Sequence, residues 1–182
     1  MTAFAPNTIG IPYFKKDREC NMEIIKQLYD INRLFENVDD FGPAYESFLK
    51  VSNVELGYRG LEGRLSEFFE DVRQTAICIA TRGQAGSGDI QFFMSGIKRV
   101  KSFMYQEKYQ IEEAITDASR SAYLATCFEK GIFEIEKYPK ENPKVVLDMS
   151  ISELLPTKLR KLRNVIPEAY YYWAKVDELL KS

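Results

Sequence analysis

Apolar residues recur at steps of three and four along most of this chain, and no other feature constrains the fold as much. At about 100° per residue, such spacing places the apolar side chains on one face of a helix. Over residues 21–38 the stripe consists of Ile24, Leu28, Ile31, Leu34, Phe35 and Val38. Similar stripes run through residues 61–82, 89–106, 109–131 and 167–181. The sequence therefore predicts an all-α fold, an antiparallel bundle of four or five helices.

The chain of 182 residues has the length of one domain, and the sequence contains no linker that would divide it. Residues 1–20 are expected to form an extended N-terminal arm, because Pro6, Gly10 and Pro12 interrupt any regular element. Residues 21–131 form the predicted bundle. Residues 150–181 form a predicted C-terminal helical hairpin.

The segment before that hairpin allows two interpretations. In residues 132–148, apolar and charged side chains alternate, so a small β-hairpin and an irregular crossover both fit. Ser150 and Glu153 have the S-x-x-E spacing of a capping box, which predicts that a helix begins there.

Small side chains distinguish the predicted helix at residues 109–131. Its stripe consists of Ile111, Ala114, Ile115, Ala118, Ala122 and Ala125. Because small side chains let helix axes approach closely, this helix is expected at the centre of the bundle.

Two groups of glycines suggest binding sites at first reading. Gly57, Gly60 and Gly63 recur every third residue, which fits either a close-packing strip for a partner or a turn between two helices. The loop at residues 83–88 lacks the lysine of a P-loop, so Gly83 is predicted as a helix C-cap and Asp89 as the next N-cap.

Composition excludes several kinds of chemistry. The chain has no histidine, and its three cysteines (Cys20, Cys78 and Cys127) are widely spaced, so we expect no metal, no cofactor and no histidine-dependent catalysis. No apolar run is long enough to span a membrane, and no signal peptide begins the sequence, so a cytoplasmic location is expected.

Acidic residues cluster, but their helical positions suggest solvated faces. Glu67, Glu70 and Asp71 fall opposite the apolar stripe of their helix, and Glu113 and Asp117 are four residues apart. We expect these side chains on the surface, with no catalytic role.

Basic residues suggest a nucleic-acid alternative. Lys158, Arg160, Lys161 and Arg163 follow Pro156 on the predicted helix 156–166, and the set of Lys98, Arg99 and Lys101 lies on another helix. The four cations are spread around their helix, and the formal net charge is −2, so binding would have to be local.

Tyr170 and Tyr171 are predicted on the exposed side of the last helix, opposite Trp173, where they would suit a protein interface. Together with Gly57, Gly60 and Gly63, they are the candidate partner-binding residues. The first functional hypothesis is therefore a non-catalytic interaction or regulatory protein that binds a protein partner or itself. The alternatives are a local nucleic-acid binder, and a small-molecule or pigment binder or enzyme with an aromatic-lined pocket between helices near residues 57–63.

Overall fold

The computed structural model describes residues 1–103 and 109–182, and the fold is all-α, as predicted. The main helices are α1 (Asn21–Asn37), α2 (Gly42–Tyr58), α3 (Leu65–Ala80), α4 (Ile90–Val100), α5 (Ile111–Glu129) and α7 (Pro167–Lys181). A short helix α6 (Leu162–Val165) precedes α7, and single 3-10 turns lie at η1 (Lys101–Phe103), η2 (Pro143–Leu147) and η3 (Thr157–Lys161). The last part of the helix predicted at 89–106, residues 104–106, lies outside the described residues.

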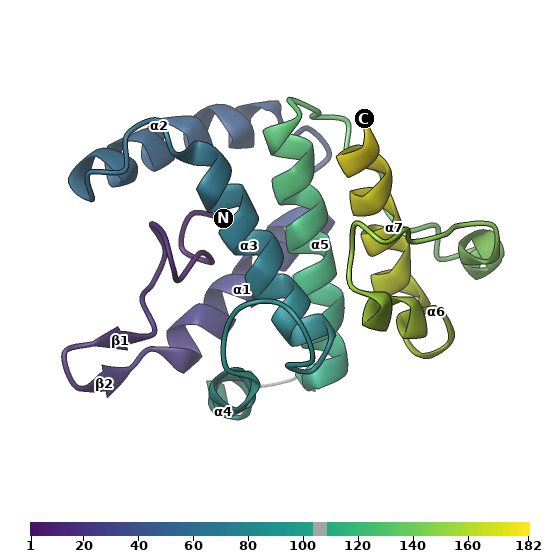
Figure 1. The fold of residues 1–182 in the computed structure, drawn as a ribbon, viewed down its shortest axis with the longest axis horizontal. Helices are drawn as coiled ribbons and strands as arrows, with labels where there is room; N and C mark the ends of the chain where they lie inside the picture. Colours follow the sequence, from purple (N-terminus) through teal and green to yellow (C-terminus); the bar gives the residue numbers. More distant parts are fainter. Residues whose placement is uncertain (104–108) are drawn as a thin grey trace.

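Helix α5 lies at the centre, between α3 on one side and α7 on the other, with α1 packed across it (Figure 1). This confirms the prediction from its small residues: Ala114, Ala118, Ala122 and Ala125 are fully buried. Helices α3 and α5 are antiparallel, since Arg82 at the end of α3 lies 2.8 Å from Glu112 at the start of α5.

Helix α7 runs in the same direction as α5, because the long crossover 130–166 returns the chain to the end at which α5 begins (Figure 1). The pairing of Arg120 with Glu168 and of Tyr123 with Tyr172 follows this parallel arrangement. The crossover is irregular. The β-hairpin considered for residues 132–148 is wrong, since that segment contains no strand and forms an irregular loop followed by the 3-10 turn η2.

The only strands among the described residues lie in the N-terminal arm, where β1 (Phe14–Lys15) pairs antiparallel with β2 (Arg18–Glu19). The capping box expected at Ser150 and Glu153 is also wrong, because residues 150–156 form no helix. By contrast, the Asp89 side chain accepts from the backbone N–H of Gln91 at the start of α4, as predicted. The prediction of Gly83 as the C-cap of α3 is wrong by two residues, because the C-cap is Thr81 and Gly83 follows it with a positive φ of 79°.

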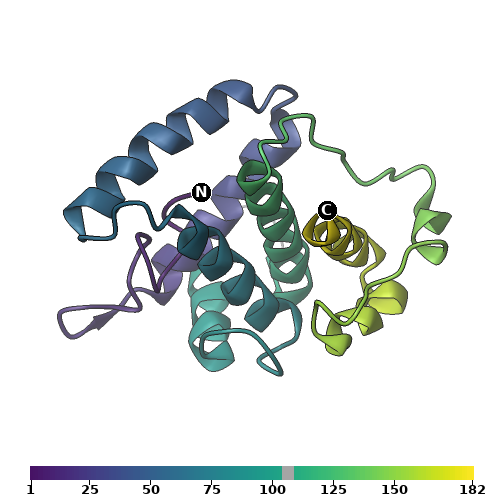
Figure 2. The same ribbon diagram turned by 45° about the horizontal axis from the view of Figure 1, so that its top comes forward.

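Helix α2 lies at the edge of the molecule (Figure 2). Its inner face inserts Phe48 between Phe68 and Phe69 of α3 and Phe128 of α5, with ring centroids 5.2, 5.6 and 5.7 Å apart. Within the described ranges, no helix is long and apolar enough to cross a membrane.

Candidate functional site

Two hollows in the surface are the candidate sites, and the sequence pointed to neither. The first is an apolar groove of about 340 Å³ between α1 and α2. The second is a cleft of about 420 Å³ between α1, α5 and the start of α7, with charged walls.

The apolar groove has walls from two helices that are consecutive in the chain. Leu34 and Val38 of α1 form one wall, and Ala44, Ser47 and Val51 of α2 form the other. Its floor is the core below, formed by Ile31, Phe35, Phe41, Phe48, Leu124 and Phe128. Leu34 is exposed, so the groove presents apolar surface to the solvent.

The α2 wall of the groove continues as a seam of exposed, mostly apolar positions along the helix. The seam consists of Ala44, Ser47, Val51, Val54 and Tyr58, at steps of three, four, three and four residues. Val51, Val54 and Tyr58 are 49%, 54% and 82% exposed. Steps of three and four are the spacing of the a and d positions that form the contact line of a coiled coil.

The charged cleft is built around Asp117 of α5, whose carboxylate is buried. Its Oδ2 atom accepts a hydrogen bond from the Tyr109 hydroxyl at 3.0 Å, and its Oδ1 atom lies 3.8 Å from Arg120 Nη1. Burial raises the pKa of Asp117 to about 7, although Arg120 and the Tyr109 hydrogen bond act in the opposite direction. The expectation that Asp117 belongs to a solvated face is therefore wrong.

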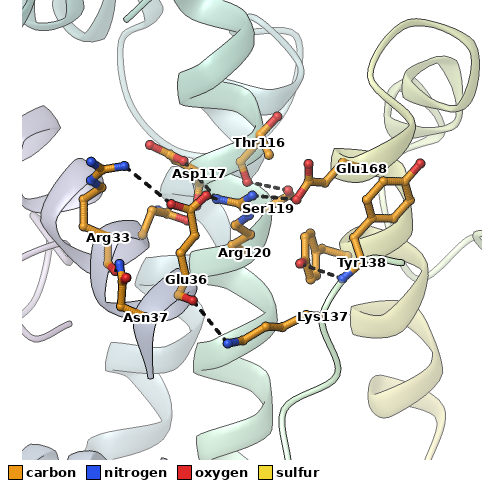
Figure 3. Close-up of polar contacts among 12 residues, drawn as sticks. Arg33, Glu36, Asn37, Thr116, Asp117, Ser119, Arg120, Lys137, Tyr138 and Glu168 are labelled. Carbon is orange, nitrogen blue, oxygen red and sulfur yellow. Dashed lines mark hydrogen bonds and ion pairs between the residues drawn. The ribbon is translucent and has the colours of Figure 1, made fainter. Parts of the chain in front are cut away.

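Arg120 connects three helices beside this carboxylate. Its Nη1 donates to Glu36 of α1 at 2.9 Å, and its Nη2 donates to Glu168 of α7 at 2.6 Å (Figure 3). The guanidinium also lies over the rings of Phe35 and Tyr172, at 5.9 and 6.0 Å from their centroids. Burial opposes the charge on Arg120, but Glu168 outweighs it and raises the pKa of the guanidinium.

The tyrosines predicted to be exposed are buried. Tyr170 lies against Arg163 and its hydroxyl donates to the carbonyl of Met149 at 3.0 Å. Tyr171 stacks edge to face on Tyr138 of the crossover. Because the crossover wraps the side of α7 that faces away from α5, both faces of the helix are covered, and these tyrosines offer no surface to a partner.

The predicted glycine strip is a turn. Gly60 and Gly63 have positive φ values of 65° and 76° between α2 and α3, and no atom lies within 4 Å of where a Cβ would be. Because no neighbouring atom comes close to Gly60 or Gly63, the left-handed backbone conformation alone accounts for glycine at both positions. Gly57 lies near the end of α2, and an added Cβ there would meet only Glu62 Oε1 at 4.0 Å.

The basic residues are not gathered into one patch. Arg160 Nε donates to the carbonyl of Ile151 at 3.0 Å, and Arg163 donates to the carbonyl of Met149 and to the Tyr170 hydroxyl. Lys158 and Lys161 are exposed and line a small pocket with Arg82. Lys98, Arg99 and Lys101 lie on α4 and η1, on the other side of α5 from α6 (Figures 1 and 2).

The described residues contain no group of three or more His, Cys, Asp or Glu side chains placed to hold a metal ion. Cys20, Cys78 and Cys127 are free and buried. Comparison of the chain with protein-family models, with curated proteins and with solved structures finds no match.

Proposed function

We propose that this chain is a non-catalytic interaction protein, and that it pairs with a second copy of itself through the exposed seam of α2. The observation that carries the proposal is the unpartnered seam of Ala44, Ser47, Val51, Val54 and Tyr58, which lies on a helix at the edge of the fold and opens into the apolar groove. Burying exposed valines against a second helix is favourable at about 25 cal/mol for each Å² of apolar surface.

Charge complementarity favours a second copy as the partner. When Val51 is an a position and Val54 a d position, Lys50 is a g position and Glu55 is an e position. In a parallel pair of helices, a g residue lies opposite the e residue five positions later on the other helix. Lys50 of each copy therefore lies opposite Glu55 of the other copy, which gives two ion pairs. In an antiparallel pair, Lys50 would meet Lys50 and Glu55 would meet Glu55. The charges therefore support a parallel, two-fold symmetric dimer.

The folded domain lowers the cost of this pairing. Two heptads are too short to form a stable coiled coil from free peptides, because helix nucleation is unfavourable. Helix α2 is already formed, since Phe48, Ser52 and Leu56 bury its other side in the core. Leu34 and Val38 of α1 lie beside the seam, so the α2 helix of the second copy would also contact them and bury more apolar surface.

We place this function in the cytoplasm, because three buried free thiols suit a reducing compartment. Nucleic-acid binding is the weaker alternative. Arg160 and Arg163 already donate to backbone carbonyls, which leaves Lys158 and Lys161 as the unshared charges of that segment.

Sedimentation velocity across a range of concentrations tests the proposal. Wild type is expected to shift from monomer to dimer, and Val54→Glu is expected to remain a monomer, because two carboxylates would meet in the seam. Asn53→Glu is the matched control, since it adds the same charge at the neighbouring exposed position outside the seam.

The charges are tested separately. Lys50→Glu is expected to weaken the dimer by about 30-fold, since two pairs change from attractive to repulsive and each exposed pair contributes about 0.5 kcal/mol in either direction. The double variant Lys50→Glu with Glu55→Lys is expected to restore it. A wild type that stays monomeric at all concentrations, or dimers unaffected by Val54→Glu, would overturn the proposal.

A further inference from the structure

Among the described residues, the charged cleft contains one buried hydrogen-bond acceptor that receives no donor, the Oδ1 atom of Asn32. Asn32 of α1 lines the cleft and is 2% exposed. Its Nδ2 donates to the carbonyls of Leu28 and Asp117, at 2.8 and 3.0 Å, which fixes the orientation of the amide. Within the described residues, its Oδ1 has no hydrogen-bond partner. A buried acceptor without a donor costs about 1–3 kcal/mol, so a donor from a ligand would be favoured there.

Asp117 presents a second acceptor beside it. The hydrogen bond from Asn32 Nδ2 to the Asp117 carbonyl makes the two residues direct neighbours. The Asp117 carboxylate uses Oδ2 for the Tyr109 hydroxyl, and within the described part of the chain Oδ1 makes only the 3.8 Å ion pair with Arg120.

The walls of the cleft favour a cation over an anion. Of the residues that the structure describes, the acidic ones that line it are Glu36, Glu112, Glu113, Asp117 and Glu168, against two basic residues, Arg33 and Arg120. Arg120 is already shared between Glu36 and Glu168. The wall at the mouth is apolar, with Val165 exposed and Ile166 half-buried, and would contact an alkyl chain.

We propose that the cleft binds a small primary alkylamine, whose ammonium group donates hydrogen bonds to Asn32 Oδ1 and Asp117 Oδ1. The alkyl chain lies against Val165 and Ile166, and a second ammonium group, in a diamine, reaches the remaining carboxylates of the cleft. An ammonium group suits this site because it carries three donors and no acceptor. The proposal is independent of the dimer proposed above, because the α2 seam contributes no residue to the cleft.

Binding is expected to depend on pH through Asp117. The groups that face it are Tyr109, Glu113, Arg120, Glu36 and Glu168, with Tyr29 in contact with Tyr109. Because the pKa of Asp117 is about 7, the carboxyl is largely protonated below that pH and largely ionised above it. An alkylamine has a pKa near 10, so it stays charged over this range. Affinity should therefore fall as the pH is lowered through about 7.

Calorimetric titration with 1,4-diaminobutane, at constant ionic strength, tests the proposal. At about pH 8, saturable binding of one diamine per chain is expected, and tetramethylammonium, which has no N–H donor, should bind at least about tenfold more weakly. Asp117→Asn should weaken diamine binding by about tenfold or more and abolish the pH dependence. Glu153→Gln removes one exposed carboxylate outside the cleft and should change nothing.

A second variant avoids the buried residues. Val165→Lys places a competing ammonium group at the mouth, where the native side chain is exposed, and should weaken diamine binding without unfolding the protein. Three results would overturn the proposal. They are the absence of saturable binding by wild type, equal binding of tetramethylammonium, and equal loss of affinity in Glu153→Gln and Asp117→Asn.

Discussion

The hydroxyl of Ser152 donates to the carboxylate of Asp177 at 2.6 Å and joins the crossover to the middle of α7 across 25 residues of sequence. The backbone N–H of Ser152 donates to the same carboxylate at 3.0 Å, and Lys181 lies 2.6 Å from it. Burial alone would raise the pKa of Asp177, but these hydrogen bonds outweigh it and lower the pKa below its ordinary value. This carboxylate therefore holds the central part of the crossover, at Ser152, against α7.

Asp177→Ala should lower the free energy of unfolding by about 1–3 kcal/mol, because it leaves two half-buried donors of Ser152 without an acceptor. Urea denaturation measures the loss. Asp148→Ala, which removes an exposed carboxylate from the same crossover, should cost about 0.5 kcal/mol or less. Because the folded pKa of Asp177 is lowered, its contribution is present above about pH 4 and is lost as the pH falls further. Equal losses in the two variants would contradict this role.

Asp71 anchors the N-terminal arm. Its carboxylate accepts from the backbone N–H and the side-chain amide of Asn7, at 2.9 and 2.7 Å, and from the Thr8 hydroxyl at 2.9 Å. Asp71→Ala should release the arm, so the amides of residues 4–10 should exchange hydrogen faster while those of α5 stay protected. Glu67→Ala, on the outer face of the same helix, should leave the exchange of the arm unchanged. Unaltered exchange in Asp71→Ala would show that the arm is held by its apolar contacts.

Stability should also depend on pH through Asp117. Because its folded pKa is raised to about 7, the folded state binds a proton more tightly than the unfolded chain, so this carboxyl stabilises the fold fully below about pH 4. That contribution is lost as the pH rises through about 7. Asp117→Asn should therefore gain stability relative to wild type as the pH rises from about 4 to 8. A difference between the two proteins that is constant across pH would contradict the raised pKa.

In the basic segment before α7, the two arginines should contribute to stability and the two lysines should not. Arg160→Ala with Arg163→Ala should destabilise the fold by about 1–3 kcal/mol, because the carbonyl of Ile151 loses its arginine donor and the carbonyl of Met149 keeps only the Tyr170 hydroxyl. Lys158→Ala with Lys161→Ala should be nearly neutral, since these side chains are exposed. Thermal denaturation compares the two pairs. If the lysines prove as costly as the arginines, the hydrogen bonds to the crossover are not the reason for the arginines.

The helices and several of their ends could be predicted because those signals are local. The stripes of α1 and α3, the small residues of α5 and the N-cap Asp89 each depend on residues within a few positions of one another. The charged cleft and the anchor of the N-terminal arm could not be predicted in the same way. Asn7 and Asp71 are 64 residues apart, and Asn32 and Asp117 are 85 apart, so their burial depends on a tertiary pairing that periodicity does not encode.

Tyr170 and Tyr171 show why the exposed side of a helix cannot always be predicted from the spacing of its residues. The spacing of residues in α7 predicts a polar, exposed side, but the irregular crossover covers that side. The path of an irregular segment cannot be predicted from periodicity, because such a segment has none. The α2 seam was the reverse case. Its spacing over Ala44, Ser47, Val51, Val54 and Tyr58 is present in the sequence, but only the structure distinguishes it from the buried side marked by Phe48.

The most direct measurement for the proposed dimer is oxidative cross-linking through the seam. The native cysteines are buried, so a single cysteine introduced on α2 reports on that helix alone. In a parallel pair, facing d positions lie close enough to the Cα separation of a disulfide, about 5.5–6 Å, to be joined. Val54→Cys should therefore form a disulfide-linked dimer under mild oxidation, and Asn53→Cys, one position off the seam, should remain monomeric. A Val54→Cys protein that stays monomeric, or that cross-links no faster than Asn53→Cys, would contradict pairing through α2.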